Sequence, residues 1–517
     1  MTDSFLPSDK TLSLYTIEEI RQIETLARAT VAQGSLMRAA GLAATNLAKT
    51  LTPISNQEIL VLAGPGDNGG DALEASHLLA ESGYAVNVIL CAEPDRYSPD
   101  AQHSLQRAKA SKITWMSPEQ LCASDNSQWS LVVDGLFGIG LTRPITGEIE
   151  SLVHCINQIT LRTNCPVLAL DVPSGLNADT GQVIGKQEIT IRATHTLTFI
   201  GNKPGLHTAR GKDIAGEVIV ACLGIADNLY PSPHLYLSHP SLFHRAIKPR
   251  RHDSHKGSHG DVLVIGGANG MTGAAILAAR SALYCGAGRV HVGFIGDVPA
   301  VDNQHPELMC RSADECDLSK AVVVIGPGLG TSTPAVQLLG KALTEATALV
   351  IDADALNLIT QMKDLRNLLV ARQKKNRGTI ITPHPLEAAR LLGVSAMDVQ
   401  FDRITSANNL VAALNSCVIL KGAGTIIAAE NEKTFINSTG NPGLATAGTG
   451  DVLAGICGAL LAQGADQTNA ARLAVWLHGR AADTLKKQGI GPTGMTASEL
   501  IPATRACLNE FISDTST

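Results

Sequence analysis

The chain has 517 residues, a net charge of -6 at pH 7, 44% hydrophobic residues and only 3% aromatic residues. A single core rarely grows to this length, so two domains are expected. The mildly acidic balance disfavours a general nucleic-acid binder, and no apolar run in the sequence is long enough to span a bilayer. We therefore expect neither nucleic acid nor membrane as a partner.

The N-terminus and the cysteines predict a cytoplasmic protein. "MTDSFLPSDK" lacks the basic segment and apolar core of a secretory signal peptide. Eleven cysteines are scattered singly, without a C-x-x-C pair. This scatter favours reduced thiols over a disulfide framework.

The first half of the chain alternates helical stretches with short apolar runs. Residues 15–49 have helical spacing, with Thr16 as an expected N-cap. Runs that are apolar throughout are typical of strands buried on both faces of a parallel sheet. Strands separated by helices predict a doubly wound α/β domain. The apolar runs lie at residues 58–64, 85–91, 131–138, 166–175 and 195–201.

Residues 230–261 are rich in Pro, Ser, His and basic residues, which predicts a linker. The linker histidines are more typical of a solvated basic segment than of a metal site; they are His252, His255 and His259. Strand-helix alternation then restarts, with runs at residues 261–270, 321–330, 348–357, 378–385 and 416–427. We expect two tandem α/β domains, a Rossmann-like doubly wound domain at residues 1–230 and a second at 238–515, with a linker at 231–250.

Three strand ends in the first half carry polar groups. "GPGDNGGDAL" follows the first apolar run, Asp134 follows a second, and Asp171 with Ser174 follows a third. Glycines let the backbone approach a ligand, and N–H groups at a helix start form an anion site. The carboxyl ends of parallel strands form the ligand crevice of an open α/β sheet, and their oxygens suit a hard cation. An ordinary tight turn with helix caps is the structural alternative.

These three loops, "GPGDNGGDAL", "VVDGLFGIGLTRP" and "DVPSGLNADTG", resemble those of the NAD(P)H-hydrate epimerase domain over roughly residues 10–225. The resemblance implies that Asp171 is the acid/base group, and that a K⁺ ion is held by Asn68, Asp134 and Ser174. The residues implied to bind the hydrated dinucleotide are Asp67, Asn68, Gly69, Gly70, Asp71, Gly138, Ile139, Gly140, Leu141, Thr142, Arg143, Pro144 and Asp171.

Four residues depart from the family pattern, namely Arg38, Pro65, Asp67 and Ala72. Pro65 removes one N–H donor, and Asp67 adds negative charge beside an anion. Weaker substrate binding is expected, but Asn68 and Asp171 are intact and activity should be retained.

"NPGLATAGTGDVLAG" at residues 441–455 is the strongest pattern in the second half. The N–H groups of residues 447–451 are expected to converge at a helix start and form an anion hole. Asp451 in the same turn can act as general base on a hydroxyl that attacks phosphorus. A purely structural helix start would need one cap residue, and this stretch has five small residues before the Asp.

With "LKGAGT", "GPGLG", "DADALN" and "TPHPLEAARL", this stretch resembles the ADP/ATP-dependent NAD(P)H-hydrate dehydratase family, which has a ribokinase-like fold, over roughly residues 238–510. The resemblance implies that Asp451 is the base, and that Mg²⁺ accompanies ADP or ATP. The implied nucleotide-binding residues are Lys421, Gly422, Ala423, Gly424, Thr425 and Gly450. The implied hydrate-binding residues are Ala274, Gly330, His384 and Asp451.

The two resemblances imply one repair pathway. The substrates would be NADHX and NADPHX, the hydrated forms of the reduced dinucleotides, which exist as R and S epimers at C6. The first domain would interconvert the epimers, and the second would dehydrate the S form while ADP becomes AMP and phosphate. A homo-oligomer is also expected. The alternative is a ribokinase-like small-molecule kinase with a non-catalytic N-terminal binding module.

Overall fold

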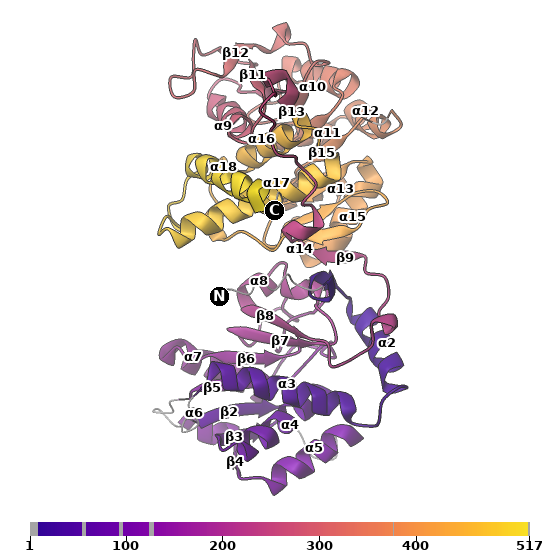
Figure 1. The fold of residues 1–517 in the computed structure, drawn as a ribbon, viewed down its shortest axis with the longest axis vertical. Coiled ribbons are helices and arrows are strands. Elements are labelled where there is room, and N and C mark those ends of the chain that lie inside the picture. The colour runs from indigo at the N-terminus through magenta and orange to yellow at the C-terminus, as the bar shows by residue number, and fades with distance from the viewer. Residues whose placement is uncertain (1–8, 54–57, 92–96, 124–128, 376, 515–517) are drawn as a thin grey trace. The chain divides into compact units, whose positions relative to one another are not determined.

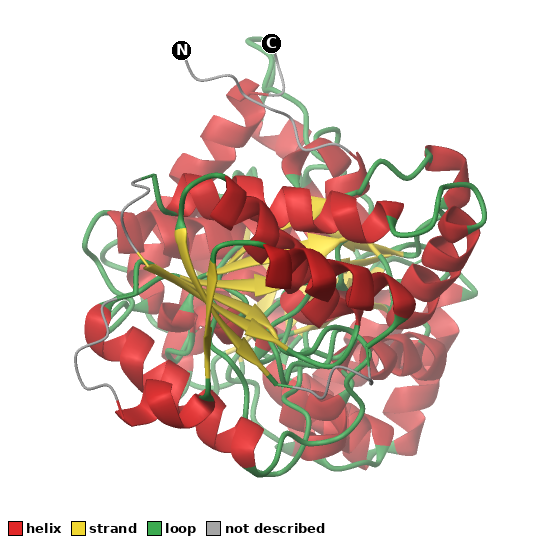
Figure 2. Ribbon diagram, turned by 90° about the horizontal axis from the view of Figure 1, so that it is seen from below, coloured by secondary structure: helices red, strands yellow, loops and turns green. Residues whose placement is uncertain are grey.

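The computed structural model describes residues 9–53, 58–91, 97–123, 129–375 and 377–514 (Figure 1). The chain divides into two compact units, an N-terminal unit at Met1–Tyr236 and a C-terminal unit at Leu237–Thr517. Each unit has a largely parallel sheet, and helices lie on both sides of the strands (Figure 2). The predicted tandem α/β fold is confirmed.

The sheet of the N-terminal unit has the strand order β4-β3-β2-β5-β6-β7-β8, and all its neighbouring strands are parallel. The order reverses between β2 and β5, and ligands of open α/β sheets bind at such a switch point. The strands are β2 (Glu58–Ala63), β3 (Ala85–Leu90), β4 (Ile113–Met116), β5 (Leu131–Gly135), β6 (Val167–Leu170), β7 (His195–Phe199) and β8 (Glu217–Ala221), with a short pair β1 (Ser13–Leu14) and β9 (Leu235–Leu237).

The predicted helical region at residues 15–49 contains two helices. Thr16 caps the first, and a reciprocal hydrogen bond with Glu19 completes a capping box. The helices of this unit are α1 (Asp9–Leu12), α2 (Ile17–Arg28), α3 (Ser35–Leu51), α4 (Asp67–Glu81), α5 (Pro99–Ala110), α6 (Pro118–Ala123), α7 (Glu148–Thr163) and α8 (Gly211–Ile214).

In the C-terminal unit the sheet runs β18-β17-β16-β15-β14-β13-β10-β11-β12. Strands from β16 to β12 are parallel, and β16, β17 and β18 are antiparallel. The order reverses between β10 and β13, which places a second switch point there. The strands are β10 (Asp261–Gly266), β11 (Arg289–Phe294), β12 (Met309–Ser312), β13 (Val322–Ile325), β14 (Leu349–Ile351), β15 (Thr379–Ile381), β16 (Cys417–Leu420), β17 (Ile426–Ala428) and β18 (Thr434–Ile436).

The helices of the C-terminal unit connect these strands and follow the last of them. They are α9 (Thr272–Tyr284), α10 (Thr333–Glu345), α11 (Ala353–Gln361), α12 (Lys363–Gln373), α13 (Pro385–Leu392), α14 (Ala396–Phe401), α15 (Arg403–Leu414), α16 (Thr449–Ala462), α17 (Gln467–Lys487) and α18 (Ala497–Asp514).

Every apolar run singled out in the sequence contains a strand. The run at 416–427 contains two, because β16 and β17 form a hairpin around the turn that begins at Lys421. The segment expected as a linker, residues 231–250, includes β9 and a 3₁₀ turn at Pro240–Leu242.

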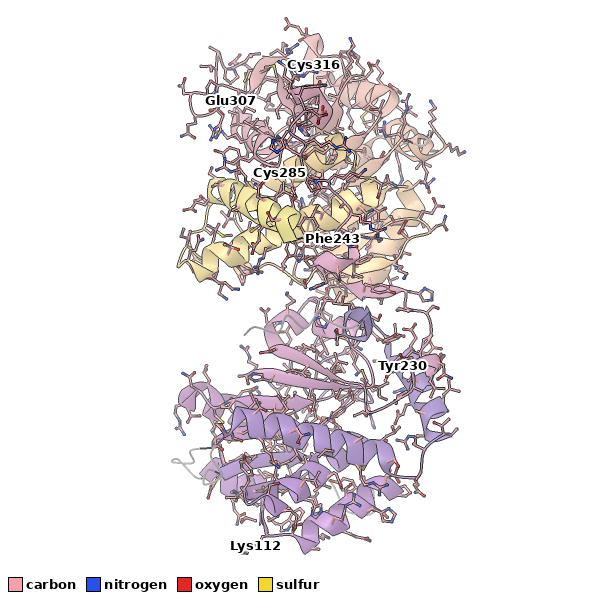
Figure 3. All side chains as sticks on the ribbon, in the orientation of Figure 1. Lys112, Tyr230, Phe243, Cys285, Glu307 and Cys316 are labelled. Carbon is pink, nitrogen blue, oxygen red and sulfur yellow. The ribbon has the colours of Figure 1, made fainter. Side chains whose placement is uncertain are left out.

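The described cysteines are free, and Cys285 and Cys316 (Figure 3) are buried. Among the described helices, none combines the length and hydropathy that crossing a membrane requires. The described residues also contain no cluster of His, Cys, Asp and Glu able to hold a metal ion by itself, so the linker histidines form none.

Candidate active sites

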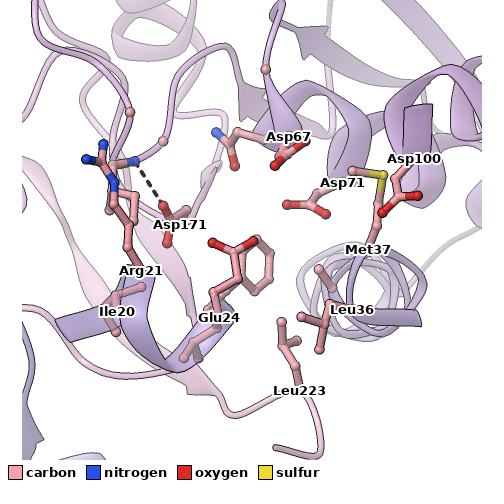
Figure 4. A pocket seen from close by; sticks show the side chains of 18 of the residues that line it. Ile20, Arg21, Glu24, Leu36, Met37, Asp67, Asp71, Asp100, Asp171 and Leu223 are labelled. Carbon is pink, nitrogen blue, oxygen red and sulfur yellow. Dashed lines mark hydrogen bonds between the residues drawn. The ribbon is translucent and has the colours of Figure 1, made fainter. Parts of the chain in front are cut away.

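A cavity of about 800 Å³ lies at the switch point of the N-terminal sheet (Figure 4). Its walls come from α2, α3 and the loops that follow β2, β5 and β6. This volume falls in the usual range for small-molecule sites. The walls therefore include all three loops predicted from the sequence.

The first predicted loop forms the first turn of α4, whose N-cap is Gly66. A Cβ on Gly64 would stand 1.7 Å from the Leu136 carbonyl oxygen, so only glycine permits this approach of the two loops. The N-terminus of α4 therefore faces the cavity, as an anion site requires. Of the five residues in this loop that were predicted to contact the ligand, Asp67, Asn68 and Asp71 line the cavity. Gly69 and Gly70 are not part of its lining.

The second predicted loop follows β5. Residues 138–143 line the cavity, whereas Pro144 lies outside the lining, and a Cβ on Gly185 would stand 2.7 Å from the Pro144 Cβ. Arg143 is exposed, so its guanidinium remains available to a phosphate.

Asp171 stands at the end of β6 with a left-handed φ of 65°, a strained conformation for a residue with a side chain. Its Oδ1 lies 2.9 Å from Lys203 Nζ, and its Oδ2 accepts a hydrogen bond from the Ile139 N–H at 3.1 Å. This strained backbone and these two contacts fix the direction of the carboxylate toward the cavity.

Lys203, which the sequence analysis missed, is 0% exposed. Its ammonium donates to Thr198 Oγ1 at 2.7 Å and to the carbonyl oxygens of Phe199 and Gly201 at 3.0 and 3.2 Å. A buried ammonium needs such partners to offset its lost hydration. The only sequence signal was a lysine in a Pro-Gly turn directly after a strand.

Asp71 lines the same cavity from α4. Burial raises its pKa well above the ordinary value, and the negative charges of Asp171 and Asp67 raise it further. The surroundings of Asp71 therefore favour the neutral form of its carboxyl group.

Asn68, Asp134 and Ser174 gather at the base of these loops. Asp134 is 0% exposed; it accepts hydrogen bonds from the Ser174 hydroxyl at 2.6 Å and the Ser174 N–H at 2.8 Å. Burial raises the pKa of Asp134 to about 6, although these hydrogen bonds oppose the shift. The side-chain oxygen and nitrogen of Asn68 are buried and have no hydrogen-bond partner within the described chain.

The structure shows how the chain accommodates the departures from the family pattern. Arg28 Nη2 lies 3.1 Å from Asp67 Oδ2, so a cation offsets the extra negative charge. Ala72 is buried in the core, outside the cavity lining, and Arg38 is exposed and also outside it. Of the remaining departures, Arg38, Pro65 and Ala72, only Pro65 lines the cavity.

The second site forms around the N-terminus of α16 in the C-terminal unit. The helix begins at Thr449, so Asp451 is its third residue, and Gly448 is the N-cap with a φ of 85°. A Cβ on Gly450 would stand 3.3 Å from Lys421 Nζ and 3.7 Å from Asp352 Oδ2. The predicted anion hole therefore adjoins the ends of β14 and β16.

Asp352 and Lys421 form an ion pair in this site, with 2.8 Å between Oδ1 and Nζ. The Thr382 hydroxyl donates to the same carboxylate oxygen at 2.6 Å. Burial lowers the pKa of Lys421, but the negative charges of Asp352 and Glu387 outweigh burial and leave it raised. A permanent cation thus stands beside the helix N-terminus.

Asp451 and Glu387 are the two carboxyl groups with strongly perturbed acidity here. Burial is the main cause that raises the pKa of Asp451 to about 7, and Asp352 adds to it. Burial also raises the pKa of Glu387 to about 7, against the charge of Lys421. A carboxyl group with a pKa near neutrality is suited to general base catalysis.

His384 caps α13, where its Nδ1 accepts hydrogen bonds from the N–H groups of Leu386 and Glu387 at 3.1 and 3.3 Å. This arrangement assigns the ring proton to Nε2. Burial, together with the charge of Lys421, lowers the pKa of His384. The ring is therefore a neutral hydrogen-bond donor, 45% exposed at its side chain.

The predicted nucleotide-binding turn, residues 421–425, joins β16 to β17. Arg403, another residue that the sequence analysis missed, donates to the carbonyl oxygens of Leu420 and Lys421 at 3.3 and 3.2 Å. A Cβ on Gly422 would stand 2.7 Å from Arg403 Nη1. The buried guanidinium therefore braces the turn from below.

Gly330 and Ala274 come from the loop after β13 and the start of α9. The Gly330 N–H donates to Asp354 Oδ2 at 2.8 Å, and its φ of 70° suits glycine. A Cβ on neighbouring Gly328 would stand 3.3 Å from the Ala274 Cβ. The two predicted residues, one in the loop after β13 and one in the first turn of α9, thus lie near the second switch point.

These observations define a tandem α/β protein in which polar residues gather at the switch point of the N-terminal sheet and around the N-terminus of α16 in the C-terminal unit. A family model described as NAD(P)H-hydrate dehydratase matches residues 262–505, and one described as YjeF-related protein N-terminus matches residues 33–205.

The chain is 38% identical to the bifunctional NAD(P)H-hydrate repair enzyme of Coxiella burnetii, over 96% of this chain and 99% of that protein. It is 36% identical to the enzyme of that name from Escherichia coli, over 93% and 90%. It is 45% identical to the ADP-dependent (S)-NAD(P)H-hydrate dehydratase of Neisseria meningitidis, over 52% and 92%. The chain belongs to the family of bifunctional NAD(P)H-hydrate repair enzymes.

Proposed function

We propose that this protein repairs hydrated nicotinamide dinucleotides in two steps, one in each unit. The N-terminal unit interconverts R- and S-NAD(P)HX at C6, and the C-terminal unit dehydrates the S epimer at the expense of ADP. The observation that carries the proposal is Asp451 at the N-terminus of α16, beside the Lys421–Asp352 pair. Similarity to bifunctional relatives along almost the whole chain supports the assignment of both activities.

In the C-terminal unit, Asp451 takes the proton of the C6 hydroxyl group, and the hydroxyl oxygen attacks the terminal phosphorus of ADP. Hydroxide is a poor leaving group, whereas the resulting phosphate ester is a good one. The N–H groups at the start of α16 and the Lys421 ammonium stabilise the charge of the transferring phosphoryl group. The ring nitrogen then expels phosphate, and loss of a ring proton restores the double bond without any redox change.

Mg²⁺ fits this site as a companion of the nucleotide. The described side chains build no metal site by themselves, and Mg²⁺ commonly binds through one or two carboxylates plus substrate phosphates. Asp352 and Glu387 would hold it from the protein side. The ion would neutralise phosphate charge during transfer.

In the N-terminal unit, the N-terminus of α4 and the loop after β5 would bind the dinucleotide's phosphates. Departure of the C6 oxygen, assisted by the ring nitrogen, leaves a planar cationic carbon. Water returning to the opposite face gives the other epimer, with Asp171 as a proton-transfer group. Because this sequence only breaks and remakes one C–O bond, it needs no nucleotide.

A K⁺ ion at Asn68, Asp134 and Ser174 belongs to this proposal. The unpartnered amide of Asn68 and the desolvated carboxyl group of Asp134 are what an oxygen-ligated cation would satisfy. The bound cation would fix the loops that carry Asn68 and Ser174, and so position the cavity walls.

The test supplies a mixture of the two epimers and either ADP or ATP, and follows both epimers by chromatography. Recovery of reduced-nicotinamide absorbance with AMP and free phosphate from ADP supports the proposal. Consumption of the R epimer should depend on the N-terminal unit. A stable phosphorylated product instead would show a small-molecule kinase, and the N-terminal unit would be a binding module if R and S did not interconvert.

A further inference from the structure

Two carboxyl groups approach the N-terminal cavity from different elements. Asp171 extends from the end of β6 and Asp71 from the first turns of α4, and in Figure 4 they stand apart at the cavity, with the Glu24 side chain between and below them. A flat nicotinamide ring between them would present one face to each group. Inversion at a ring carbon needs proton transfer on both faces, because the oxygen leaves one and returns to the other.

The surroundings of these two groups differ. Asp171 is held by the Lys203 ammonium and by the Ile139 N–H, which fix the direction of its carboxyl group. Asp71 is only 9% exposed, and no residue within the described ranges forms a hydrogen bond with its side chain. Burial is the main cause that raises the pKa of Asp71, and the negative charge of Asp171 raises it further. Environments that divide two carboxyl groups in this way assign one as acid and the other as base.

We propose that Asp71 is the general acid of the epimerase site, with the Lys203-paired Asp171 as the complementary base. This inference rests on the proposed function of the N-terminal unit. Asp71 is a catalytic residue because its proton goes to the departing oxygen. Lys203 is a positioning residue that acts through Asp171.

Protons and electrons balance over one turnover. The Asp71 carboxyl proton is transferred to the C6 hydroxyl, the C6–O bond breaks with its electrons on oxygen, and water leaves. The ring nitrogen's lone pair forms the C=N bond of the cationic intermediate. A second water adds to C6 from the other face and gives a proton to Asp171. Asp71 and Asp171 then regain their starting states by proton exchange with water in the open cavity, and the reverse order converts S to R.

Glu24 is another carboxyl group at the cavity, but its surroundings do not suit this role. Glu24 Oε1 lies 2.7 Å from Arg28 Nη2, and its side chain is 29% exposed. Its contact with a guanidinium and its partial exposure differ from the buried setting of Asp71, which has no such contact in the described residues. Asp67 is likewise paired with Arg28 and is 48% exposed at its side chain. Asp100 also lines the cavity, and its Oδ2 lies 4.0 Å from Arg28 Nη1. Unlike Glu24, Asp67 and Asp100, Asp71 forms no ion pair within the described ranges, which favours it as the proton donor.

The test compares Asp71→Asn and Asp71→Glu with the wild type in the full chain, with R- and S-NADHX interconversion followed by chromatography without nucleotide. Asparagine keeps the shape but cannot donate the proton, so kcat should fall about 10²- to 10⁴-fold while KM stays within a few-fold. Glutamate retains a proton donor and should recover part of that loss. Glu81→Gln, an exposed substitution at the other end of α4, is the matched control with wild-type rates.

Lys203→Met tests the other half of the pair, since methionine fills a similar volume without a cation. Its kcat should fall while KM changes little, and the dependence of kcat on pH should shift, which a purely structural defect would not produce. Thermal melts show whether each variant is folded.

The outcomes are distinguishable. A wild-type chain that does not speed interconversion would overturn the proposed function itself. If the wild type is active and Asp71→Asn interconverts the epimers at the same rate, only the role of Asp71 would be overturned. The same holds if Asp71→Asn is impaired and Asp71→Glu is no faster than it.

Discussion

Asp134 is a buried carboxyl group and Asp451 a partly buried one, and their neighbours differ. Beside Asp451 stand the Lys421 cation and the N-terminus of α16, so its negative form has nearby support. In the described part of the chain, Asp134 accepts hydrogen bonds from the hydroxyl and N–H of Ser174 and from the Leu136 N–H. These differences are consistent with the proposed roles, a base for Asp451 and a K⁺ ligand for Asp134.

The acidity of Asp451 predicts how dehydration depends on pH. The base must be ionised, and burial raises its pKa to about 7. Dehydratase kcat/KM should therefore fall as pH drops through about 7, and should level off above it. Because Glu387 titrates in the same range, the profile of Glu387→Gln separates the two groups. Persistence of the acidic limb in that variant assigns it to Asp451, and its disappearance would assign it to Glu387. Asp451→Asn should remove dehydration at every pH.

The buried Asp134 predicts a pH-dependent effect of K⁺ on stability. Its folded-state pKa of about 6 exceeds the ordinary 3.8, so protonation favours the folded state. This contribution is complete below the ordinary pKa and is lost as pH rises through about 6. Keeping the group ionised at pH 8 costs about 3 kcal/mol, which a bound cation can offset.

K⁺ should therefore raise the melting temperature of the N-terminal unit by several degrees at pH 8 and much less at pH 5. Scanning calorimetry in KCl against choline chloride at equal ionic strength measures this difference. Asp134→Asn should abolish the K⁺ response. An equal response at both pH values would contradict a site built on the ionised carboxylate.

Single residues also mark the limit of what the sequence could predict. Asp451 and Asp171 could be found because each stands in a dense local pattern of glycines and small residues. Lys203 and Arg403 could not, because their roles depend on Asp171 and the Lys421 turn, 32 and 18 positions away. Long-range pairing within a fold leaves no local pattern.

At the scale of elements, α4 packs against the sheet through unusually close contacts. Ala72 on α4 faces Gly135 at the end of β5, where a Cβ on Gly135 would stand 2.4 Å from the Ala72 Cβ. Two methyl groups cannot share this space, so the glycine at one position permits the alanine at the other. Ala72, which departs from the family pattern, therefore changes the packing of the core and not the residues that line the cavity.

This contact predicts coupling between two substitutions. Gly135→Ala should destabilise the N-terminal unit by about 1–3 kcal/mol through overpacking. Ala72→Gly alone should cost about 1 kcal/mol, because glycine is a poor residue for a helix interior. In the double variant, Ala72→Gly should relieve part of the Gly135→Ala defect, since the Leu62 carbonyl oxygen would still lie 3.0 Å from the new Cβ. Additive losses in urea unfolding would show that the two positions do not compete.

Elements differ in how far the sequence predicts them. The central strands β2, β5 and β6 are buried along almost their whole length and form unbroken apolar runs. The edge strands β4 and β8 are exposed or half-buried. They were not predicted, although β8 contains the apolar run at residues 218–221. The hairpin of β16 and β17 was predicted as one run, because its short turn does not interrupt the apolar pattern for long.

At the scale of the whole molecule, each unit has its own core and its own site. One core cluster extends from Leu263 to Ala428 in the C-terminal unit, and another from Tyr15 to Ile225 in the N-terminal unit. Each site is complete within its unit: Asp171 and Asp71 lie in the first, and Asp451 and Lys421 in the second. The sequence predicted two domains from two series of strand–helix alternation, which is a feature that repeats over hundreds of residues.

Separate cores and sites predict separate responses to ligands. A ligand that binds only the folded form stabilises it by about 2.7 kcal/mol at a concentration 100-fold above its Kd. ADP with Mg²⁺ should therefore raise the melting transition of the C-terminal unit, whereas K⁺ should raise that of the N-terminal unit. Calorimetry of the full chain resolves the two transitions, and Asp134→Asn identifies which one responds to K⁺.

Lys421→Met, which removes the cation beside the anion hole, should suppress the ADP response and leave the K⁺ response unchanged. If ADP shifted both transitions in the wild type and neither variant separated them, the two sites would have to be coupled, and the division of the two reactions between independent units would be wrong.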